Sequence, residues 1–324
     1  MKKLITIMIP AYNEEKVLPQ LFARLDKLAT NNTDYDFEFL FINDGSKDKT
    51  MAMIHQKSEK DARISYINLS RNFGKERAML AGFDYAKGDA LVIIDADLQD
   101  PPELIPKMIK HWEDGYDDVY AKRSSREGET WLKKYTSSKF YSLLEKMSQV
   151  EIQRDTGDFR LLDRRAIEAL KTLRENNRYT KGMFSWVGFK KKEITYSRDP
   201  RAAGETKWNY GKLFNLAIEG ITSFTTAPLR ISTFAGFLIS FASFIWVAYL
   251  VIRRIFFSVD MSGYTSLMAG ILLLGGIQLI SIGIIGEYIS RIFIETKNRP
   301  VYLAQEIKEY KREKSKPAKK QPRI

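Results

Sequence analysis

The 324-residue sequence predicts an α/β domain with a mostly parallel sheet, followed by a hairpin of two membrane-spanning helices. Short apolar runs alternate with helical patterns in the first part of the chain, which is typical of βαβ units. Two uncharged stretches, 232–252 and 264–286, are each long enough to cross the hydrocarbon core, which needs about 20 residues. The chain has no cysteine, so a disulfide framework, a cysteine-based zinc site and a thiol nucleophile are excluded.

The predicted strands are apolar runs that end at polar residues. Four of them are expected at 4–9, 37–42, 64–69 and 90–94, and helices connect them. Beyond them we expect a strand over 118–126 and a helix over 131–147. Residues 155–163 contain Gly and several Asp residues and predict a turn that presents Asp158 and Arg160.

The stretch 91–102, LVIIDADLQDPP, is the centre of the predicted site. Asp95 and Asp97 follow a buried strand at its carboxyl end, where ligands bind in open α/β sheets. Because side chains alternate along an extended chain, the two carboxylates point the same way. Two hard oxygen ligands in this place suit a divalent cation that holds the phosphates of a substrate.

Polar residues also follow the other three strands, at the same edge of the predicted sheet. They are Tyr12, Asn13, Glu14, Asp44, Asn72 and Lys75. Four such groups in register indicate one binding site. Neither G-x-G-x-x-G nor G-x-x-x-x-G-K-[ST] occurs, which disfavours the usual dinucleotide site and the P-loop.

The C-terminal part is predicted to lie at a membrane. Residues 198–208 form a polar, basic loop, and the apolar spacing over 209–230 predicts an amphipathic helix at the bilayer surface. Only 253–263 separates the two apolar stretches, so they form a hairpin. The Lys- and Arg-rich tail over 291–324 is expected in the cytoplasm together with the first domain. The net charge of +12 is concentrated in this tail, which favours a membrane surface over nucleic acid as the partner.

Several motifs together resemble the family-2 glycosyltransferases of GT-A fold. They are Pro10-Ala-Tyr-Asn-Glu14, Asn43-Asp-Gly-Ser46, Leu69-Ser-Arg-Asn-Phe-Gly-Lys75, Asp95-Ala-Asp-Leu-Gln-Asp-Pro-Pro102, Gly157-Asp-Phe-Arg160 and Gly204-Glu-Thr-Lys-Trp208. More narrowly, the chain is similar to polyprenyl-phosphate glycosyltransferases such as bactoprenol glucosyltransferases and dolichol-phosphate mannose synthases. The resemblance implies a GT-A domain over 1–208, an amphipathic helix over 209–230, a hairpin over 231–290 and a cytoplasmic tail over 291–324.

The resemblance also implies roles for the motif residues. The nucleotide sugar would be bound by Pro10, Tyr12, Asn13, Glu14, Asp44, Asn72, Lys75, Asp95 and Arg123, with Tyr12, Glu14 and Asp44 at the base and ribose. The metal, Mg²⁺ or Mn²⁺, would be held by Asp97 and Gln99. The catalytic group would be Asp95, Asp97, Asp158 and Arg160, and the acceptor phosphate would meet Arg160, Arg201 and Lys207. Thr206 stands where relatives often carry Ser, which keeps the hydroxyl.

The implied reaction is inverting transfer from a nucleotide sugar to polyprenyl phosphate, which yields a lipid-linked sugar for cell-envelope glycans. UDP-glucose and UDP-N-acetylglucosamine both fit as donors, GDP-mannose stays open as a third, and the lipid implied for a bacterial chain is undecaprenyl phosphate. A phosphate monoester has a second pKa of about 6, so its oxygen is mostly deprotonated at neutral pH. Asp158 is therefore expected to position the acceptor or to balance Arg160 rather than act as a base. The resemblance implies a plasma-membrane enzyme with both termini cytoplasmic and allows a homotetramer.

The sequence disfavours three other function classes. A processive polysaccharide synthase carries a Q-x-x-R-W motif and several spans that form a channel, whereas this sequence has no Arg-Trp pair. A non-catalytic membrane-tethered sensor of nucleotide sugars would be expected to lose metal ligands, whereas Asp95, Asp97 and Gln99 are all present. A nucleic-acid binder is the least favoured class.

Overall fold

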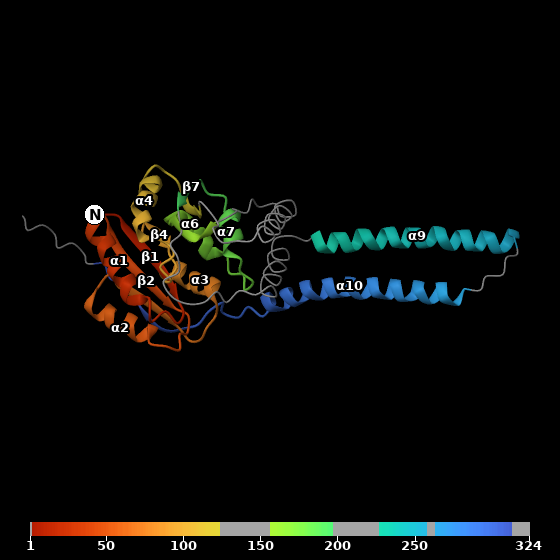
Figure 1. Cartoon of the computed structure of the whole chain (residues 1–324), viewed down its shortest axis with the longest axis horizontal. Coiled ribbons are helices and arrows are strands. Elements are labelled where there is room, and N and C mark those ends of the chain that lie inside the picture. Colours follow the sequence, from red (N-terminus) through yellow and green to blue (C-terminus); the bar gives the residue numbers. More distant parts are fainter. Residues whose placement is uncertain (1, 124–155, 197–226, 258–262, 313–324) are drawn as a thin grey trace, which may run out of the picture.

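The computed structural model describes residues 2–123, 156–196, 227–257 and 263–312 (Figure 1). In this part of the chain, eight strands form one sheet in the order β7-β5-β6-β4-β1-β2-β3-β8. The strands are β1 (Leu4–Ala11), β2 (Asp36–Asn43), β3 (Ile64–Leu69), β4 (Ala90–Ile93), β5 (Asp118–Arg123), β6 (Thr156–Asp163), β7 (Lys191–Tyr196) and β8 (Ala304–Lys308). The helices are α1 (Leu18–Asn31), α2 (Thr50–Lys60), α3 (Lys75–Tyr85), η1 (Pro102–Leu104), α4 (Ile105–Glu113), α6 (Arg164–Thr172), α7 (Thr180–Trp186), α9 (Ala227–Phe257) and α10 (Tyr264–Thr296).

Helices cover both faces of the sheet, so its central strands are buried on each side. Along β1, Ile7 and Ile9 pack with the cluster under α1, α2 and α4, while Met8 packs with α3, α6 and α7 on the other face. A strand that is buried on both faces reads as a continuous apolar run, which explains why the sequence indicates β1 to β4 closely. The predicted α/β sheet is confirmed as mostly parallel. Among the described strands, only β6 and β8 run antiparallel to their neighbours.

The turn predicted over 155–163 is wrong, because this segment forms β6 between β4 and β5. Phe159 and Leu161 face one layer of the core and Leu162 faces the other, so the alternation of a buried strand outweighs the Gly and Asp residues that resemble a turn. The predicted helix over 131–147 and most of the amphipathic helix over 209–230 lie outside the described residues.

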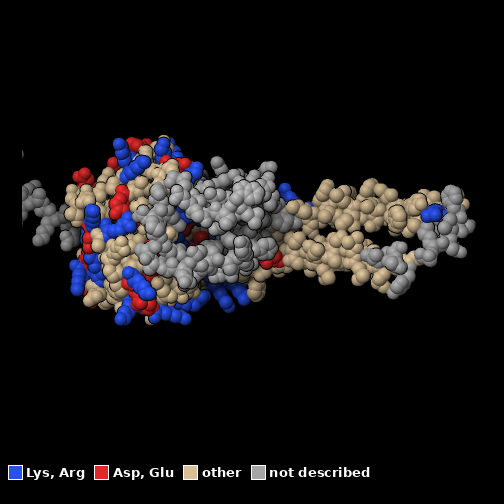
Figure 2. Space-filling view, viewed as in Figure 1, with Lys and Arg blue, Asp and Glu red and all other residues tan. Residues whose placement is uncertain are grey.

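The two predicted apolar helices are present and extend together away from the sheet (Figure 1). With 31 and 33 residues, α9 and α10 are roughly 46 and 50 Å long at about 1.5 Å per residue. The segments Leu229–Leu250 and Gly270–Thr296 have mean hydropathies of 1.9 and 1.8. Figure 2 shows charged side chains over the sheet domain and few along the helices. Phe244 is 73% exposed and Leu279 is 72% exposed, so this surface fits membrane association.

After α10 the chain returns to the sheet domain, which the sequence did not indicate. β8 adds to the sheet edge by antiparallel pairing with β3, with Ile67 opposite Ile307. Its five residues are mostly exposed and lie in a strongly basic segment, so no apolar run marks them as a strand. The C-terminal end of the hairpin is consequently attached to the sheet domain through β8.

Candidate active site

The loops that follow β2 and β3 interlock around a buried carboxylate. Asp44 accepts backbone hydrogen bonds from Phe73 at 2.7 Å and from Gly74 at 2.9 Å, and burial raises the pKa of Asp44. Gly45 has a φ of +65°, and a Cβ there would lie 2.4 Å from the carbonyl carbon of Arg71. The structure therefore places Asp44 as the link between these two loops, while Asn72 is exposed on the outer one.

The loop after β1 is held against the loop after β2. Asn13 has a φ of 58°, its N–H donates to Ser46 Oγ at 3.0 Å, and its Oδ1 accepts from the Lys47 N–H at 2.8 Å. The Glu14 N–H donates to Thr50 Oγ1 at 2.8 Å. These bonds fix the turn that follows Pro10 and leave Tyr12 37% exposed at the carboxyl edge of the strands.

Asp95 and Asp158 face each other because of the pairing between β4 and β6. Ile93 lies opposite Arg160 in this antiparallel ladder, so the register, continued by two residues, sets Asp95 opposite Asp158. The Nζ atom of Lys75 lies between them, 2.5 Å from Asp95 Oδ1 and 2.6 Å from Asp158 Oδ2. Lys75 thereby joins the loop after β3 to the ends of β4 and β6.

The charges of this cluster are strongly coupled. Burial disfavours the ionised form of Asp158, but Lys75, Lys181 and Arg160 outweigh that effect and lower the pKa of Asp158 to about 2. Partial loss of water around the Lys75 ammonium opposes its charge, and the carboxylates of Asp158 and Asp95 outweigh this effect and raise the pKa of Lys75. At neutral pH Asp158 and Lys75 are therefore both charged. The second oxygen of Asp158, Oδ1, is buried and has no hydrogen-bond partner among the described residues.

Asp95, Asp97 and Gln99 alternate with buried neighbours. Ala96, Leu98 and Asp100 are buried, whereas the three predicted site residues are partly exposed. Asp100 accepts a hydrogen bond from the Tyr196 hydroxyl at 3.0 Å and one from the Asp95 N–H at 3.3 Å. These bonds tie the loop that follows β4 to the end of β7. The Gln99 N–H donates to Asp97 Oδ1 at 3.1 Å.

This donor set fits a divalent cation whose coordination is completed by a substrate. Among the described residues no group of three or more His, Cys, Asp or Glu side chains could hold a metal alone. Mg²⁺ is commonly bound by only one or two carboxylates together with substrate phosphates and water. The partly exposed oxygens of Asp97 and Gln99, at the carboxyl edge, match that arrangement.

Arg160 was predicted to meet the acceptor phosphate, whereas the structure buries it beneath this edge. Its residue exposure is 0%, its Nη1 lies 2.9 Å from Asp118 Oδ2, and its guanidinium carbon lies 3.7 Å from the ring centroid of Phe184. The strand conformation of β6, rather than a turn, turns the side chain into the core. Arg160 consequently acts on the site through the fold and through its charge near Asp158.

Two further cations lie near Asp158. Arg123 ends β5, and its Nε is buried without a hydrogen-bond partner among the described residues. Lys181, at the start of α7, was not found from the sequence, because a single lysine in a helix carries no pattern. Burial lowers the pKa of Lys181, while the nearby Asp158 opposes that shift. The predicted phosphate ligands Arg201 and Lys207 lie outside the described residues.

Known proteins resemble this chain over nearly its whole length. An uncharacterized glycosyltransferase of Synechocystis is 48% identical over 303 residues, which cover 94% of this chain and 95% of that protein. The bactoprenol glucosyl transferase of Shigella phage SfII is 46% identical over 299 residues, covering 92% and 96%. A prophage bactoprenol glucosyl transferase homolog of Escherichia coli is 45% identical over 304 residues, covering 94% and 99%.

Solved structures give more distant similarities. S. aureus TarS with UDP-GlcNAc has a TM-score of 0.48 and 15% identity, covering 69% of this chain and 66% of that one. Glucosyl-3-phosphoglycerate synthase from Mycobacterium tuberculosis, with Mn²⁺, UDP and phosphoglyceric acid, has a TM-score of 0.46 and 14% identity, covering 68% and 76%.

Two family models match the two parts of the structure. The GtrB C-terminal hairpin matches residues 227–292, which comprise α9 and most of α10. The glycosyl transferase family 2 model matches residues 6–171, which include β1 to β6 and the Lys75–Asp95–Asp158 cluster. With this match and near full-length relatives at 45% to 48% identity, the chain belongs to glycosyl transferase family 2 and is a glycosyltransferase.

Proposed function

We propose that this enzyme transfers a sugar, with inversion, from UDP-glucose or UDP-N-acetylglucosamine to a polyprenyl phosphate such as undecaprenyl phosphate. One observation carries the proposal: a charged cluster at the carboxyl edge of the sheet belongs to a domain to which an exposed apolar hairpin is attached through β8. Such a hairpin suits an acceptor that stays in the bilayer and presents only its phosphate. The names of the phage and prophage relatives support a glucosyl donor and a bactoprenol acceptor.

The donor would occupy the edge formed by β1, β2 and β4. Tyr12 and Glu14 would contact the base and ribose, and Asp44 would keep the surrounding loops in shape because both of its oxygens accept backbone N–H groups. Asp97 and Gln99 would hold Mg²⁺ or Mn²⁺, and the bound metal would stabilise negative charge on the leaving diphosphate. Asp95, held by Lys75, would face the sugar.

The acceptor would approach from the side of β5, β6 and α7. With a second pKa of about 6, its phosphate is roughly 90% dianionic at pH 7, so it needs cations more than it needs a base. Lys181 and Arg123 would supply them, together with Arg201 and Lys207 from the sequence prediction; the charge of Lys181 near Asp158 and the unpartnered Nε of Arg123 among the described residues support this. Asp158, with a pKa of about 2, would orient Lys75 and limit the repulsion among these cations.

The hairpin would anchor the enzyme in the plasma membrane, with the catalytic domain and both termini in the cytoplasm. The basic tail supports this orientation by the positive-inside rule. A sensor without activity or a processive synthase would share the donor site but not the product.

The proposal is tested by the identity of the product. The purified full-length enzyme in vesicles is given undecaprenyl phosphate, Mg²⁺ or Mn²⁺ and, one at a time, UDP-glucose, UDP-N-acetylglucosamine and GDP-mannose. Mass analysis of the extracted lipid should show a single sugar added with one of the UDP-sugars. A polymer would instead indicate a processive synthase, and unmodified lipid with every donor would contradict the proposal.

A further inference from the structure

We propose that Glu295, in the last turn of α10, is a positioning residue that locks the membrane hairpin to the loop in front of α7 and so orients the catalytic edge toward an acceptor in the bilayer. This inference rests on the proposed function. The contact lies between the end of the hairpin and the catalytic domain.

Glu295 uses both of its carboxylate oxygens on one short loop. The backbone N–H of Asn176 donates to Oε1 at 2.8 Å, and that of Asn177 donates to the same oxygen at 3.4 Å. The side-chain Nδ2 of Asn176 donates to Oε2 at 3.3 Å. Hydrogen bonds to an ionised acceptor are stronger than neutral ones, so this contact is well suited to fix a helix end.

The same loop is joined to the start of α3, which carries Lys75. Arg77 donates from Nη2 to the carbonyl oxygen of Asn176 at 3.3 Å. At the far end of the loop, the N–H of Thr180 donates to Glu76 Oε2 at 2.9 Å, and the Thr180 hydroxyl donates to the same oxygen. Glu76 and Arg77 directly follow Lys75, so a continuous series of contacts joins the end of α10 to the lysine between Asp95 and Asp158.

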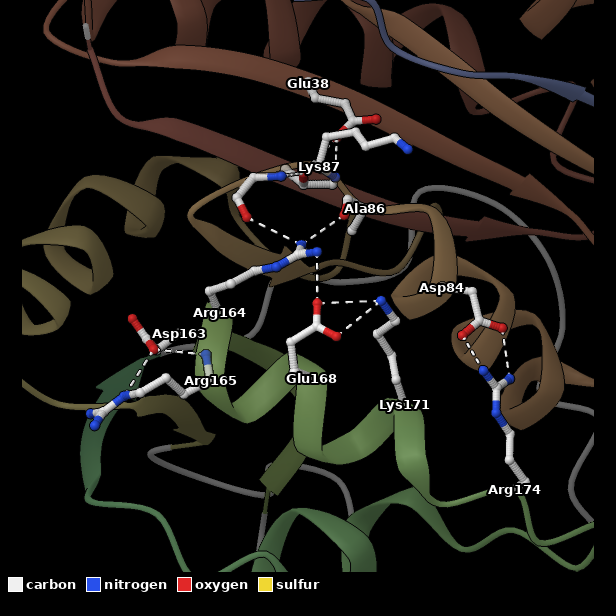
Figure 3. Close-up of polar contacts among 12 residues, drawn as sticks. Glu38, Asp84, Ala86, Lys87, Asp163, Arg164, Arg165, Glu168, Lys171 and Arg174 are labelled. Carbon is white, nitrogen blue, oxygen red and sulfur yellow. Dashed lines mark hydrogen bonds and ion pairs between the residues drawn. The ribbon is translucent and has the colours of Figure 1, made fainter.

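A second attachment follows within a few residues. Tyr302 donates from its hydroxyl to Asp84 Oδ2 at 2.7 Å. Arg174 binds both oxygens of Asp84 at 2.7 Å each (Figure 3). Ser70 donates its N–H to the Leu303 carbonyl at 2.9 Å, just before β8 begins. The seven residues between Thr296 and Ala304 can span at most about 25 Å, so the end of α10 cannot move far from the sheet.

The length of α10 and the charges near its C-terminal end support a position for Glu295 outside the hydrocarbon. The helix is roughly 50 Å long, whereas the apolar core of a bilayer is about 30 Å thick. Glu287, Arg291 and Glu295 are spaced four apart near its C-terminal end, and charged groups are costly at the bilayer centre. Glu287 pairs with Arg291 on the helix itself at 2.9 Å, whereas Glu295 reaches the catalytic domain. The C-terminal end of α10 is therefore fixed to the catalytic domain through Glu295.

The experiment compares one enzyme on two acceptors. Full-length wild type, Glu295→Ala, Glu295→Lys and Glu295→Gln are assayed with UDP-glucose and with UDP-N-acetylglucosamine. The acceptors are undecaprenyl phosphate in vesicles of phosphatidylethanolamine and phosphatidylglycerol that hold the enzyme, and the short, water-soluble geranyl phosphate. Glu287→Ala is the matched control, because it also removes one carboxylate from α10 but one whose ion pair is with Arg291 on the same helix.

We expect Glu295→Ala and Glu295→Lys to lower kcat/KM for the vesicle-bound lipid at least fivefold, with less than a twofold change for geranyl phosphate and for the KM of the donor. Glu295→Gln should recover most of the activity because its amide oxygen still accepts from Asn176. Tyr302→Phe, which removes a single hydroxyl, should give a smaller loss in the same direction and decides the matter if the Glu295 variants do not fold. Equal losses on both acceptors, or no loss on either, would overturn the inference. If the wild type used neither acceptor, the proposed function itself would fail and this inference with it.

Discussion

Replacing Asp158 with Asn tests whether this carboxylate is a general base. Its pKa is lowered from 3.8 to about 2, a preference for the ionised form on the order of 2 kcal/mol. Because the folded-state pKa is lowered, the stabilisation is present above about pH 4 and is lost as the pH falls toward 2. The ion pair with Lys75 is therefore intact throughout the pH range of an assay.

The same value makes Asp158 a poor acceptor for a proton of the substrate. Moving a proton from a phosphate with a pKa of about 6 to a carboxylate with a pKa of about 2 is uphill by about four units, or roughly 5 kcal/mol. We expect the rate to depend on the ionisation of the acceptor instead. Asp158→Asn removes one charge-assisted contact of Lys75, worth roughly 1.5–3 kcal/mol, which corresponds to a loss of about 10- to 150-fold.

The assay measures kcat/KM from pH 5 to 9 for the wild type, Asp158→Asn and the control Asp114→Asn, which changes an exposed carboxylate on the far end of α4. All three profiles should fall below about pH 6, where the acceptor gains its proton, and the ratio of wild type to Asp158→Asn should stay constant. A wild-type profile that is flat from pH 5 to 7 beside a variant that recovers steeply with rising pH would refute this reasoning.

Three further predictions concern other charged residues. Lys181→Met should raise the KM for the acceptor about 10-fold or more, a loss on the scale of one charge-assisted contact, with less than a twofold change for the donor; equal changes in both would argue against an acceptor contact. Asp97→Ala, or excess EDTA on the wild type, should abolish transfer measured as labelled lipid, and full turnover in EDTA would exclude the metal assignment. Arg160→Met should lower the free energy of unfolding by roughly 3–5 kcal/mol, because it leaves Asp118 buried without its partner; a thermal melt in detergent close to that of the wild type would contradict this.

The central strands could be predicted from the sequence because burial on both faces leaves a continuous apolar run. The carboxyl edge with Asp95 and Asp97 followed directly from that pattern. β6 was missed since Gly157 and Asp158 resemble a turn, and its alternation becomes evident only between two neighbouring strands. β8 was missed for the opposite reason, because an exposed edge strand needs few apolar residues.

The composition of the charged cluster depends on register, which local patterns do not contain. Asp158 meets Asp95 only because β4 and β6 pair with Ile93 opposite Arg160. The same register turns the side chain of Arg160 into the core. An arginine is well suited to bind a phosphate, but its place in β6 buries this one. Lys181 lies near Asp158 because the start of α7 contacts α3. No motif in the sequence indicates this contact.

The stoichiometry of the reaction shows whether the enzyme with the Lys75–Asp95–Asp158 edge transfers one sugar to each lipid phosphate. Full-length enzyme in vesicles is allowed to consume a limiting amount of undecaprenyl phosphate. Three quantities are then measured in the same sample: the nucleoside diphosphate released, the sugar bound to lipid and the undecaprenyl phosphate consumed. We expect equal amounts of released nucleoside diphosphate, lipid-bound sugar and consumed undecaprenyl phosphate, and no lipid-bound sugar with Asp97→Ala. Nucleoside diphosphate released without lipid-bound sugar, or several sugars per lipid phosphate, would contradict it.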